Sequence, residues 1–461
     1  MIHKIDKDVL GIYERLESAG FEVYLVGGCV RNLLLDKEPK DWDLTTNATP
    51  ENLQAVFPDS FYDNSFGTVG VPLPQVTENE HPGVVEITTF RTESSYKDHR
   101  RPEKVSWGKT IDEDLSRRDF TINAIALKLT NKHAEFELID PFNGQEDLKI
   151  KTIKAVGKAD ERFKEDSLRL MRAVRFATQL SFSIEKKTME AIVKNAGLIK
   201  HVSGERIRDE LLKILASENA YEGVMLLDVT GLLDLILPEL ALGKGVSQER
   251  PGRHHTYDVF THNVLALKYC GSNNPITRFA TLLHDVGKPK VRSEDENGLV
   301  IFYNHEVAGA RITREICDRL HFSKKEREKI ITLIRWHMFT IDEHITDSAV
   351  RRFIRRVGLE NVRDMIDLRI GDRLGSGTQT AESWRLKKFK ERIELQLNPP
   401  FSINDLKVDG NDIMRELKIK PGPAIGKILQ ALFEECDEDL SKNNREYLIF
   451  RIHEEYKKLN K

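Results

Sequence analysis

The sequence contains 461 residues, and its 71 basic and 74 acidic side chains leave a formal net charge of only −3. At roughly 150 residues per domain, this length predicts about three structural units. Four cysteines without a CxxC pair argue against a thiolate zinc site and a disulfide framework. No apolar run approaches the roughly 20 residues that cross a bilayer. We therefore expect a cytoplasmic protein without a membrane segment, and the balanced charge argues weakly against nucleic-acid binding unless basic residues gather locally.

The first 150 residues combine helical and strand patterns. Residues 6–20 have helical periodicity, and residues 21–28 (FEVYLVGG) predict a buried strand that runs into a glycine turn. Segments rich in β-branched residues predict further strands at Thr68–Leu73, Val84–Phe90 and Glu135–Ile139.

After Pro141 the pattern becomes helical, and from about residue 158 to 445 nearly every periodic segment has helical spacing. We therefore expect an α+β protein, in which a small mixed head with a β-sheet precedes all-α regions. The expected parts are a head at 1–150, a helical neck and body at 151–254, a histidine-containing helical module at 255–375 and a helical tail at 376–461.

The strongest local pattern follows the first predicted strand, in the segment Val26-Gly27-Gly28-Cys29-Val30-Arg31. Two glycines after a strand let the backbone approach a triphosphate closely, and an arginine can pair with a phosphate. Gly28 and Arg31 are therefore candidate nucleotide-binding residues.

A pair of alternating carboxylates follows in Lys40-Asp41-Trp42-Asp43-Leu44. If this segment is a strand, Asp41 and Asp43 point to one face, and Glu86 on a neighbouring strand is the candidate third carboxylate. Hard oxygen ligands suit Mg²⁺, and two ions about 3.5–4 Å apart can activate a 3′ hydroxyl and neutralise a leaving pyrophosphate. A glycine turn or a carboxylate pair alone indicates an ordinary surface feature. Together they predict a nucleotidyl-transfer site with Asp41, Asp43 and Glu86 as its catalytic residues.

With four later blocks, these residues resemble the signature of the class II tRNA nucleotidyltransferase and bacterial poly(A) polymerase family over residues 20–215. The resemblance implies that Arg118 contacts the incoming nucleotide and that a hinge joins head and neck. It also implies a nucleotide-selecting helix that carries Asp166, Arg169, Arg172 and Arg175. The four blocks are Arg117–Ala124, Asp140–Gly144 (the hinge), Glu165–Arg175 and Glu205–Glu210.

An aspartate and an arginine can together select bases by hydrogen bonding. Cytosine and adenine each present an amino donor beside a ring-nitrogen acceptor, which suits a carboxylate beside a guanidinium. Uracil and guanine would place a carbonyl oxygen against the carboxylate. Asp166 and Arg169 are three residues apart on a predicted helix, so we expect them to be neighbours. Arg172 continues their stripe, whereas Arg175 is turned further round, to contact phosphate or to pack.

Two features bear on an RNA substrate. The polar segment Phe90–Pro102 matches the flexible loop with which family members add the terminal adenosine, and enzymes restricted to CC addition tend to lack it. Residues 151–215 hold 15 basic and 9 acidic side chains, a local excess of positive charge that suits the phosphates of tRNA.

A second constellation lies in the module at 255–375, where histidines and aspartates follow in the order H…HD…H…H…D. Imidazole and carboxylate ligands from several helices suit Zn²⁺, Mn²⁺, Fe or Ni²⁺, whose bound water can become a hydroxide near neutral pH. The order resembles the HD-domain phosphohydrolases, which implies metal-dependent phosphohydrolase activity. The alternative is a degenerate HD fold that is kept for tRNA binding. The candidate ligands are His262, His284, Asp285, His305, His337 and Asp372.

We therefore expect a CCA-adding tRNA nucleotidyltransferase that uses CTP and ATP, with Mg²⁺ in the head and a divalent transition metal in the HD domain. Three alternatives stay open: an enzyme that adds only A, a poly(A) polymerase, and a protein that binds RNA ends without transferase chemistry.

Overall fold

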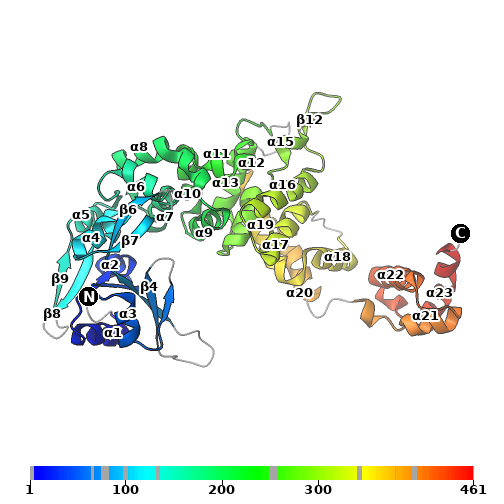
Figure 1. Cartoon of the computed structure of the whole chain (residues 1–461). Helices are drawn as coiled ribbons and strands as arrows, with labels where there is room; N and C mark the ends of the chain where they lie inside the picture. The colour runs from blue at the N-terminus through cyan, green and yellow to red at the C-terminus, as the bar shows by residue number, and fades with distance from the viewer. Residues whose placement is uncertain are drawn as a thin grey trace. The chain divides into compact units, whose positions relative to one another are not determined.

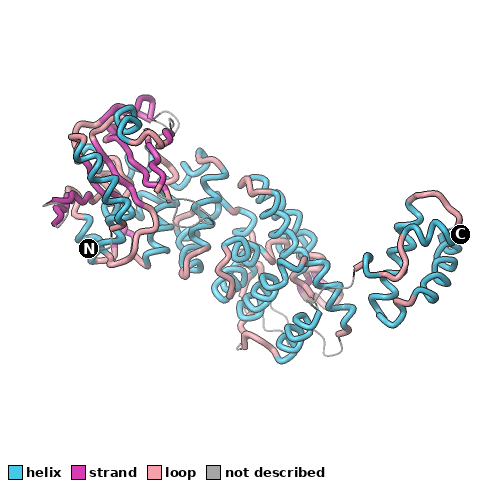
Figure 2. Tube along the Cα trace, turned by 90° about the horizontal axis from the view of Figure 1, so that it is seen from below, coloured by secondary structure: helices cyan, strands magenta, loops and turns pink. Residues whose placement is uncertain are grey.

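The computed structural model describes residues 5–63, 67–73, 83–96, 102–130, 135–248, 257–339, 345–378, 380–396 and 402–459 (Figure 1). The chain divides into two compact units. The first unit holds residues 1–241 and 316–322, and the second holds residues 242–315 and 323–461. The expected fold class is confirmed, because strands concentrate in the N-terminal head and helices make up most of the rest (Figure 2). No helix in the described ranges is long and apolar enough to cross a membrane.

A seven-stranded mixed sheet forms the centre of the head, in the order β3-β4-β5-β2-β1-β8-β9. Neighbouring strands are antiparallel except for the central pair β2 and β5, which run parallel. The expected strands form as β4, β5 and β9. The strands are β1 (Val23–Val26), β2 (Trp42–Thr46), β3 (Phe61–Asp63), β4 (Thr68–Pro72), β5 (Val84–Thr89), β8 (Ala126–Thr130) and β9 (Glu135–Ile139).

One buried tyrosine ties the first helix to this sheet. The helix predicted at 6–20 forms as α1 (Lys7–Ser18), and Tyr13 on it is fully buried. The Tyr13 hydroxyl donates to the Val23 carbonyl oxygen at 2.8 Å and accepts from the Leu129 N–H at 3.0 Å. Because a buried hydroxyl needs partners, these two hydrogen bonds fix α1 against both β1 and β8.

Further elements of the head surround the sheet. The segment Phe90–Pro102 was expected to be a loop. Instead, its first part forms the strand β6 (Arg91–Tyr96), which pairs with the strand β7 (Pro102–Trp107) that starts at its end. Residues 97–101 lie outside the described residues. The helices of this region are α2 (Gly28–Leu34), α3 (Pro50–Val56), α4 (Ile111–Ser116) and α5 (Gly144–Lys149).

The neck and body of the first unit are helical, apart from the two-residue strands β10 (Thr152–Ile153) and β11 (Ser183–Ile184). One expectation is wrong here: Asp166 and Arg169 do not share a helix. Asp166 has an extended backbone after the end of one helix, and Arg169 begins the next. The helices are α6 (Ala159–Glu165), α7 (Arg169–Leu180), α8 (Lys186–Asn195), α9 (Gly204–Leu215), α10 (Ala220–Val229), α11 (Leu233–Ile236) and α12 (Pro238–Ala241).

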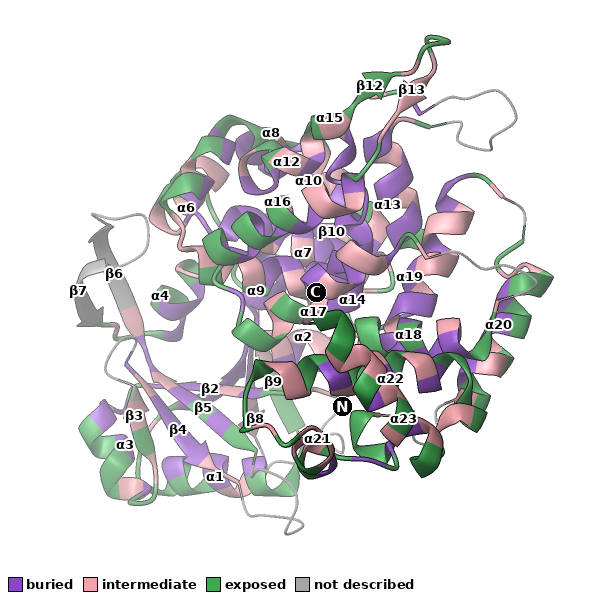
Figure 3. Cartoon of the chain, turned by 90° about the vertical axis from the view of Figure 1, so that its right-hand side faces the viewer, coloured by how far each residue is buried: buried purple, intermediate pink, exposed green. Residues whose placement is uncertain are grey.

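In the second unit, α13 (Val259–Tyr269) and α19 (Val362–Gly375) approach each other closely, and α13 is buried over much of its length (Figure 3). A Cβ atom on Gly371 would lie 2.5 Å from the Ala266 carbonyl oxygen, and one on Gly375 would lie 2.7 Å from the Ala266 nitrogen. Only glycine permits this backbone approach. These two glycines flank Asp372, so they bring it against the helix that carries His262.

The remaining elements of this unit are mostly helices of the HD module and the tail. A small hairpin pairs β12 (Ser293–Glu294) with β13 (Val300–Ile301). The helices are α14 (Pro275–Leu283), α15 (Lys288–Val291), α16 (His305–Arg319, of which residues 316–319 belong to the first unit), α17 (Lys324–Trp336), α18 (Asp347–Val357), α20 (Trp384–Gln396), α21 (Gly410–Leu417), α22 (Pro423–Glu438) and α23 (Arg445–Leu459).

Candidate functional sites

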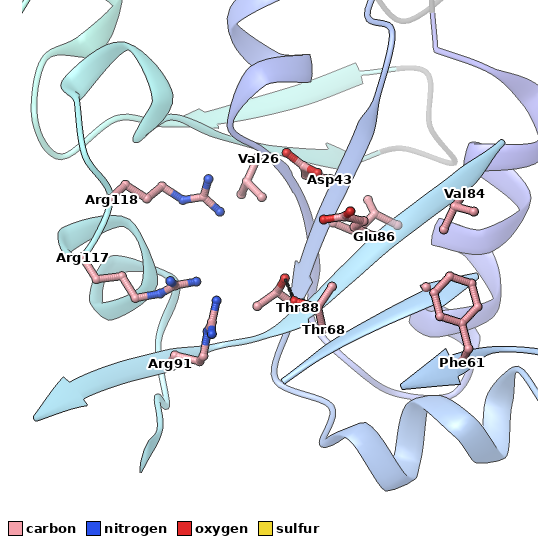
Figure 4. A pocket seen from close by; sticks show the side chains of 12 residues that line it. Val26, Asp43, Phe61, Thr68, Val84, Glu86, Thr88, Arg91, Arg117 and Arg118 are labelled. Atoms are coloured by element: carbon pink, nitrogen blue, oxygen red, sulfur yellow. Dashed lines mark hydrogen bonds between the residues drawn. The ribbon is translucent and has the colours of Figure 1, made fainter. Parts of the chain in front are cut away.

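Two carboxylates lie side by side on the central parallel strands of the head. Asp43 on β2 and Glu86 on β5 occupy paired positions in the register. Both line a cavity of about 490 Å³, and Arg91, Arg117 and Arg118 line it from the opposite side (Figure 4). Acidic groups therefore face basic groups across a space large enough for a nucleotide.

Asp41 has a different position from its predicted one. The strand begins at Trp42, so Asp41 precedes it, and its side chain is exposed and does not line the cavity. Burial raises the pKa of Asp43, the positive charge of Arg118 opposes that rise, and the negative charge of Asp41 adds to it. Negative charge thus accumulates around a half-buried carboxylate, and such a set of oxygen donors fits a hard divalent cation.

Gly27 lies close to the side chains of Arg118 and Asp43. Its φ is 75°, and a Cβ atom there would come within 2.9 Å of an Arg118 guanidinium nitrogen and 3.3 Å of an Asp43 carboxylate oxygen. Gly28, the expected nucleotide-binding glycine, begins α2, and a Cβ on it would meet only Arg31, at 3.8 Å. The first glycine of the pair is therefore the one that the geometry requires.

A buried aspartate that the sequence reasoning missed orients two arginines of the cavity. Asp114 is fully buried on α4 and forms ion pairs with Arg117 at 2.7 Å and Arg118 at 3.3 Å. The pKa of Asp114 is lowered because these two guanidinium groups outweigh the effect of burial. Its spacing of three and four residues before the arginine pair was the signal that could have identified it.

Three arginines predicted to bind nucleotide surround one phenyl ring in the first unit. The guanidinium carbons of Arg31, Arg172 and Arg175 lie 5.3, 5.2 and 4.2 Å from the centre of the Phe176 ring. Burial and the charges of the neighbouring arginines lower the pKa of Arg31 to about 10, although Asp119 opposes this shift.

Asp119 balances part of that positive charge. It is buried and accepts from Arg172 at 2.7 Å and from the Asn123 side chain at 3.2 Å. Burial would raise the pKa of Asp119, but the charges of Arg172 and Arg169 and these hydrogen bonds lower it to about 2. Asn123 also accepts from Arg31 at 2.8 Å, so it connects the glycine turn to the neck.

The predicted base-selecting pair is held by other residues. The Asp166 carboxylate pairs with Arg206 on α9 at 2.9 Å. Arg169 pairs with Glu165 at 2.6 Å and donates to the Arg117 carbonyl oxygen at 3.0 Å. The two side chains are therefore anchored separately, Asp166 by Arg206 and Arg169 by Glu165.

In the second unit, the six predicted HD ligands converge in two groups of three, His262 with His284 and Asp372, and Asp285 with His305 and His337. Within each group, the possible ligand atoms all lie within 4.8 Å of one another. Asp285 also connects the groups, because one of its oxygens lies 3.2 Å from His262 Nε2 and the other lies 3.2 Å from His305 Nε2. This is the arrangement that a carboxylate bridging two cations requires.

Backbone carbonyls orient three of the four imidazoles. The Nδ1 atoms of His284, His305 and His337 lie 2.7–2.8 Å from the carbonyl oxygen three residues earlier. If Nδ1–H donates to that oxygen, Nε2 is left with its lone pair directed at the centre. Burial would lower the pKa of His262, but hydrogen bonds with Asp285 and Asp372 raise it to about 9. A centre with this affinity for positive charge fits divalent cations.

Lys288 also contacts this centre, and the sequence analysis gave it no role. It is 8% exposed, and its ammonium group donates to Asp285 and to the Gln248 side-chain oxygen, both at 2.5 Å. The charges of Lys288 and the histidines hold the pKa of Asp285 well below its usual range despite burial.

Three family models match successive parts of the chain. Residues 23–154 match the poly A polymerase head domain, residues 181–242 match the probable RNA and SrmB-binding site of polymerase A, and residues 254–374 match the HD domain.

The CCA-adding enzyme of Lactobacillus delbrueckii subsp. bulgaricus is 46% identical over 231 residues, which are 50% of this chain and 56% of that protein. The chain thus spans little more than half the length of this curated relative. Two other relatives match over most of their lengths. The CCA-adding enzyme of Limosilactobacillus reuteri is 32% identical over 96% of this chain and 95% of its own. The A-adding tRNA nucleotidyltransferase of Deinococcus radiodurans is 33% identical over 89% and 90%.

Among solved structures, the Bacillus stearothermophilus CCA-adding enzyme in complex with CTP superimposes with a TM-score of 0.70 and 26% identity over 98% of both chains. The full-length matches, the three domain models and this fold agree with one another. The chain therefore belongs to the tRNA nucleotidyltransferase and poly(A) polymerase family.

Proposed function

We propose that this protein transfers CMP and AMP from CTP and ATP to the 3′ end of tRNA. The observation that carries this proposal is the pair Asp43 and Glu86, which occupy paired positions on parallel strands and face Arg118 across one cavity. Asp41, Asp43 and Glu86 are the proposed ligands of Mg²⁺, which would supply charge neutralisation for the attacking hydroxyl and the leaving pyrophosphate. Arg118 contacts the nucleotide, and the ion pair with Asp114 holds the Arg118 side chain in that position.

The proposed phosphate-binding residues are Gly28, Arg31, Arg172 and Arg175. Arg31, Arg172 and Arg175 gather around the Phe176 ring, and a cluster of guanidinium groups is suited to phosphate oxygens. The proposed partners are tRNA, CTP and ATP. A cytoplasmic location fits the four cysteines, which are buried and form no disulfide with one another.

The head proposal is tested by substitution of the two adjacent aspartates. We expect Asp43→Ala and Asp41→Ala to abolish nucleotide incorporation while tRNA binding stays close to wild type, since the lost groups hold metal rather than RNA. Near-normal incorporation by either variant would contradict its assignment. Asp59→Ala, which removes an exposed carboxylate of the same head, serves as the control.

Base selection is proposed to rest on Asp166 and Arg169. Asp166→Ala should relax discrimination against UTP and GTP because the carboxylate that repels their carbonyl oxygens is gone. Arg169→Ala should weaken use of the correct nucleotides. Wild-type selectivity in Asp166→Ala would contradict this assignment.

The extent of addition is tested with three substrates: tRNA lacking CCA, tRNA ending in C and tRNA ending in CC. Each is incubated with one nucleotide at a time. We propose that all three are extended, whereas an A-adding enzyme would extend only the third. Repeated addition of A would instead indicate a poly(A) polymerase, and tRNA binding without extension would indicate an RNA-end-binding protein.

We propose a second activity, metal-dependent phosphate hydrolysis, for the HD centre. The supporting observation is Asp285, whose two oxygens face His262 and His305 in the two ligand groups. A divalent transition metal such as Mn²⁺, Ni²⁺, Zn²⁺ or Fe would activate water there. The double variant His284→Ala, Asp285→Ala should lose hydrolysis of a 2′,3′-cyclic phosphate and of a phosphomonoester while nucleotide addition continues. If the wild-type protein hydrolyses neither and binds no transition metal, the degenerate tRNA-binding alternative replaces this one.

A further inference from the structure

A second cavity of about 330 Å³ lies in the second unit, separate from the residues of the metal centre. Its walls come from the end of α17, from one face of α18, and from single residues of α16 and α20. Two of its lining residues, Trp336 and Met338, flank the ligand His337, and a third, Glu306, follows the ligand His305. The cavity therefore adjoins two of the helices that carry metal ligands.

Aromatic side chains form one wall of this cavity. Phe339, Phe353 and Phe389 pack together, with ring centres 4.7–5.6 Å apart. Trp336 lines the cavity as well and is only partly buried. A concave surface with π faces at its edge is suited to stacking a nucleobase.

Three arginines give the same cavity a positive charge. The guanidinium groups of Arg335 and Arg356 lie 4.5 and 5.1 Å from the Trp336 ring, and Arg352 lines the cavity one helical turn before Arg356. Glu306 is the single carboxylate among the described residues that line the cavity, and it lies 3.5 Å from Arg335.

The two arginines of α18 have little compensating charge. Arg352 comes no closer than 3.9 Å to Glu438, and no carboxylate among the residues that the structure describes pairs with Arg356. Their neighbours on the same helix differ, because Arg351 and Arg355 both bind Asp437. Arg352 and Arg356 thus have guanidinium groups available for an anion.

We propose that this cavity binds a nucleoside phosphate, with its base stacked on Trp336 and its phosphate held by Arg352 and Arg356. The aromatic wall selects a planar base, and the two guanidinium groups select an anion beside it. The ligand is either a free nucleotide or one residue of a single-stranded RNA end. This binding requires neither nucleotide transfer in the head nor hydrolysis at the metal centre.

Fluorescence of Trp336 measures this site alone. The emission of the Trp336→Phe variant is subtracted from that of the wild type at constant metal content, and the difference is followed as ligand is added. We expect AMP to quench this difference signal. Adenosine, which lacks the phosphate, and ribose 5-phosphate, which lacks the base, should bind at least roughly tenfold more weakly. If a short single-stranded RNA binds more tightly than AMP, the ligand is an RNA end; if AMP binds more tightly, the ligand is a free nucleotide.

Substitutions separate this site from general attraction of anions. The double variant Arg352→Ala, Arg356→Ala should weaken AMP binding about tenfold, because charge-assisted hydrogen bonds are lost. Arg363→Ala removes an exposed guanidinium from α19 and should leave binding unchanged. Asp43→Ala in the head should also leave the Trp336 signal unchanged. The proposal is overturned if neither AMP nor RNA changes the Trp336 emission at millimolar concentration, or if Arg363→Ala weakens binding as much as the double variant does.

Discussion

Substitution of Gly27 tests whether the glycine turn maintains the geometry of the head site. In Gly27→Ala, the new Cβ would meet an Arg118 nitrogen at 2.9 Å and an Asp43 oxygen at 3.3 Å. At least one of these two groups must move, and both belong to the proposed site. Since a displacement of about 1 Å can cost roughly 100-fold in rate and the shift needed here is smaller, we expect kcat/KM for CMP incorporation to fall by about 10- to 100-fold.

The same substitution also strains the backbone, because φ at this position is 75° and ψ is −132°. A residue with a Cβ in such a sparsely populated region costs about 1–3 kcal/mol of folding free energy. Gly20→Ala is the matched control: φ at Gly20 is also positive, at 85°, but nothing lies within 4 Å of an added Cβ. We expect it to lower stability by about 1 kcal/mol and to leave incorporation unchanged.

Both variants are compared by urea unfolding and by single-turnover incorporation of CMP into tRNA lacking CCA. Incorporation by Gly27→Ala within a few-fold of wild type would refute the argument that this glycine sets the Arg118 and Asp43 positions. Equal loss of activity in Gly20→Ala would also refute it, because backbone strain alone would then explain the effect.

Three further predictions concern charge. Arg206→Ala should increase UTP misincorporation, since the Asp166 carboxylate loses its anchor, and Arg206→Lys should restore part of the selectivity; unchanged fidelity would contradict the anchoring role. Asp285→Asn should lower transition-metal content, measured by elemental analysis after dialysis, and unchanged content would argue against bridging. The folded-state pKa of Asp119 is about 2, below its ordinary value of 3.8, so its charge stabilises the fold above about pH 4 and this contribution is lost as the pH falls towards 2. Asp119→Asn should therefore remove up to about 2 kcal/mol at pH 7 and flatten the acid-dependent loss, as urea unfolding at several pH values would show.

Local patterns predicted some of the strands of the head, among them β4, β5 and β9, but not β3 or β8. Strand periodicity placed Glu86 on a strand, and the structure puts that strand beside the one with Asp43. The start of β2 was less predictable, because a strand boundary depends on pairing with neighbours and not on alternation alone. For that reason Asp41 lies outside the strand that was expected to carry it.

Contacts between distant segments could not be predicted in the same way. Asp166 and Arg206 are 40 residues apart in the sequence. Their pairing depends on the turn between α6 and α7, and the sequence gives no sign of this turn because its helical pattern is continuous there. The six candidate HD ligands could be chosen from the sequence because residue type and order carry the signal, and the structure brings them together in two groups. Their division into two groups could not be predicted, because it depends on the close approach of α13 and α19 at Gly371 and Gly375.

Two of the candidate HD ligands directly follow the ends of helices. His284 follows the last residue of α14 and His337 follows the last residue of α17, and both ring nitrogens bond backward to carbonyl oxygens of those helices. A cation bound by these rings would also interact favourably with the negative ends of two helix dipoles. Metal binding and the order of the final helical turns should therefore be thermodynamically linked, each favouring the other. Trp336 belongs to the final turn of α17. Removal of metal by a chelator should therefore alter the surroundings of Trp336 in the proposed nucleoside phosphate cavity before any larger part of the protein unfolds.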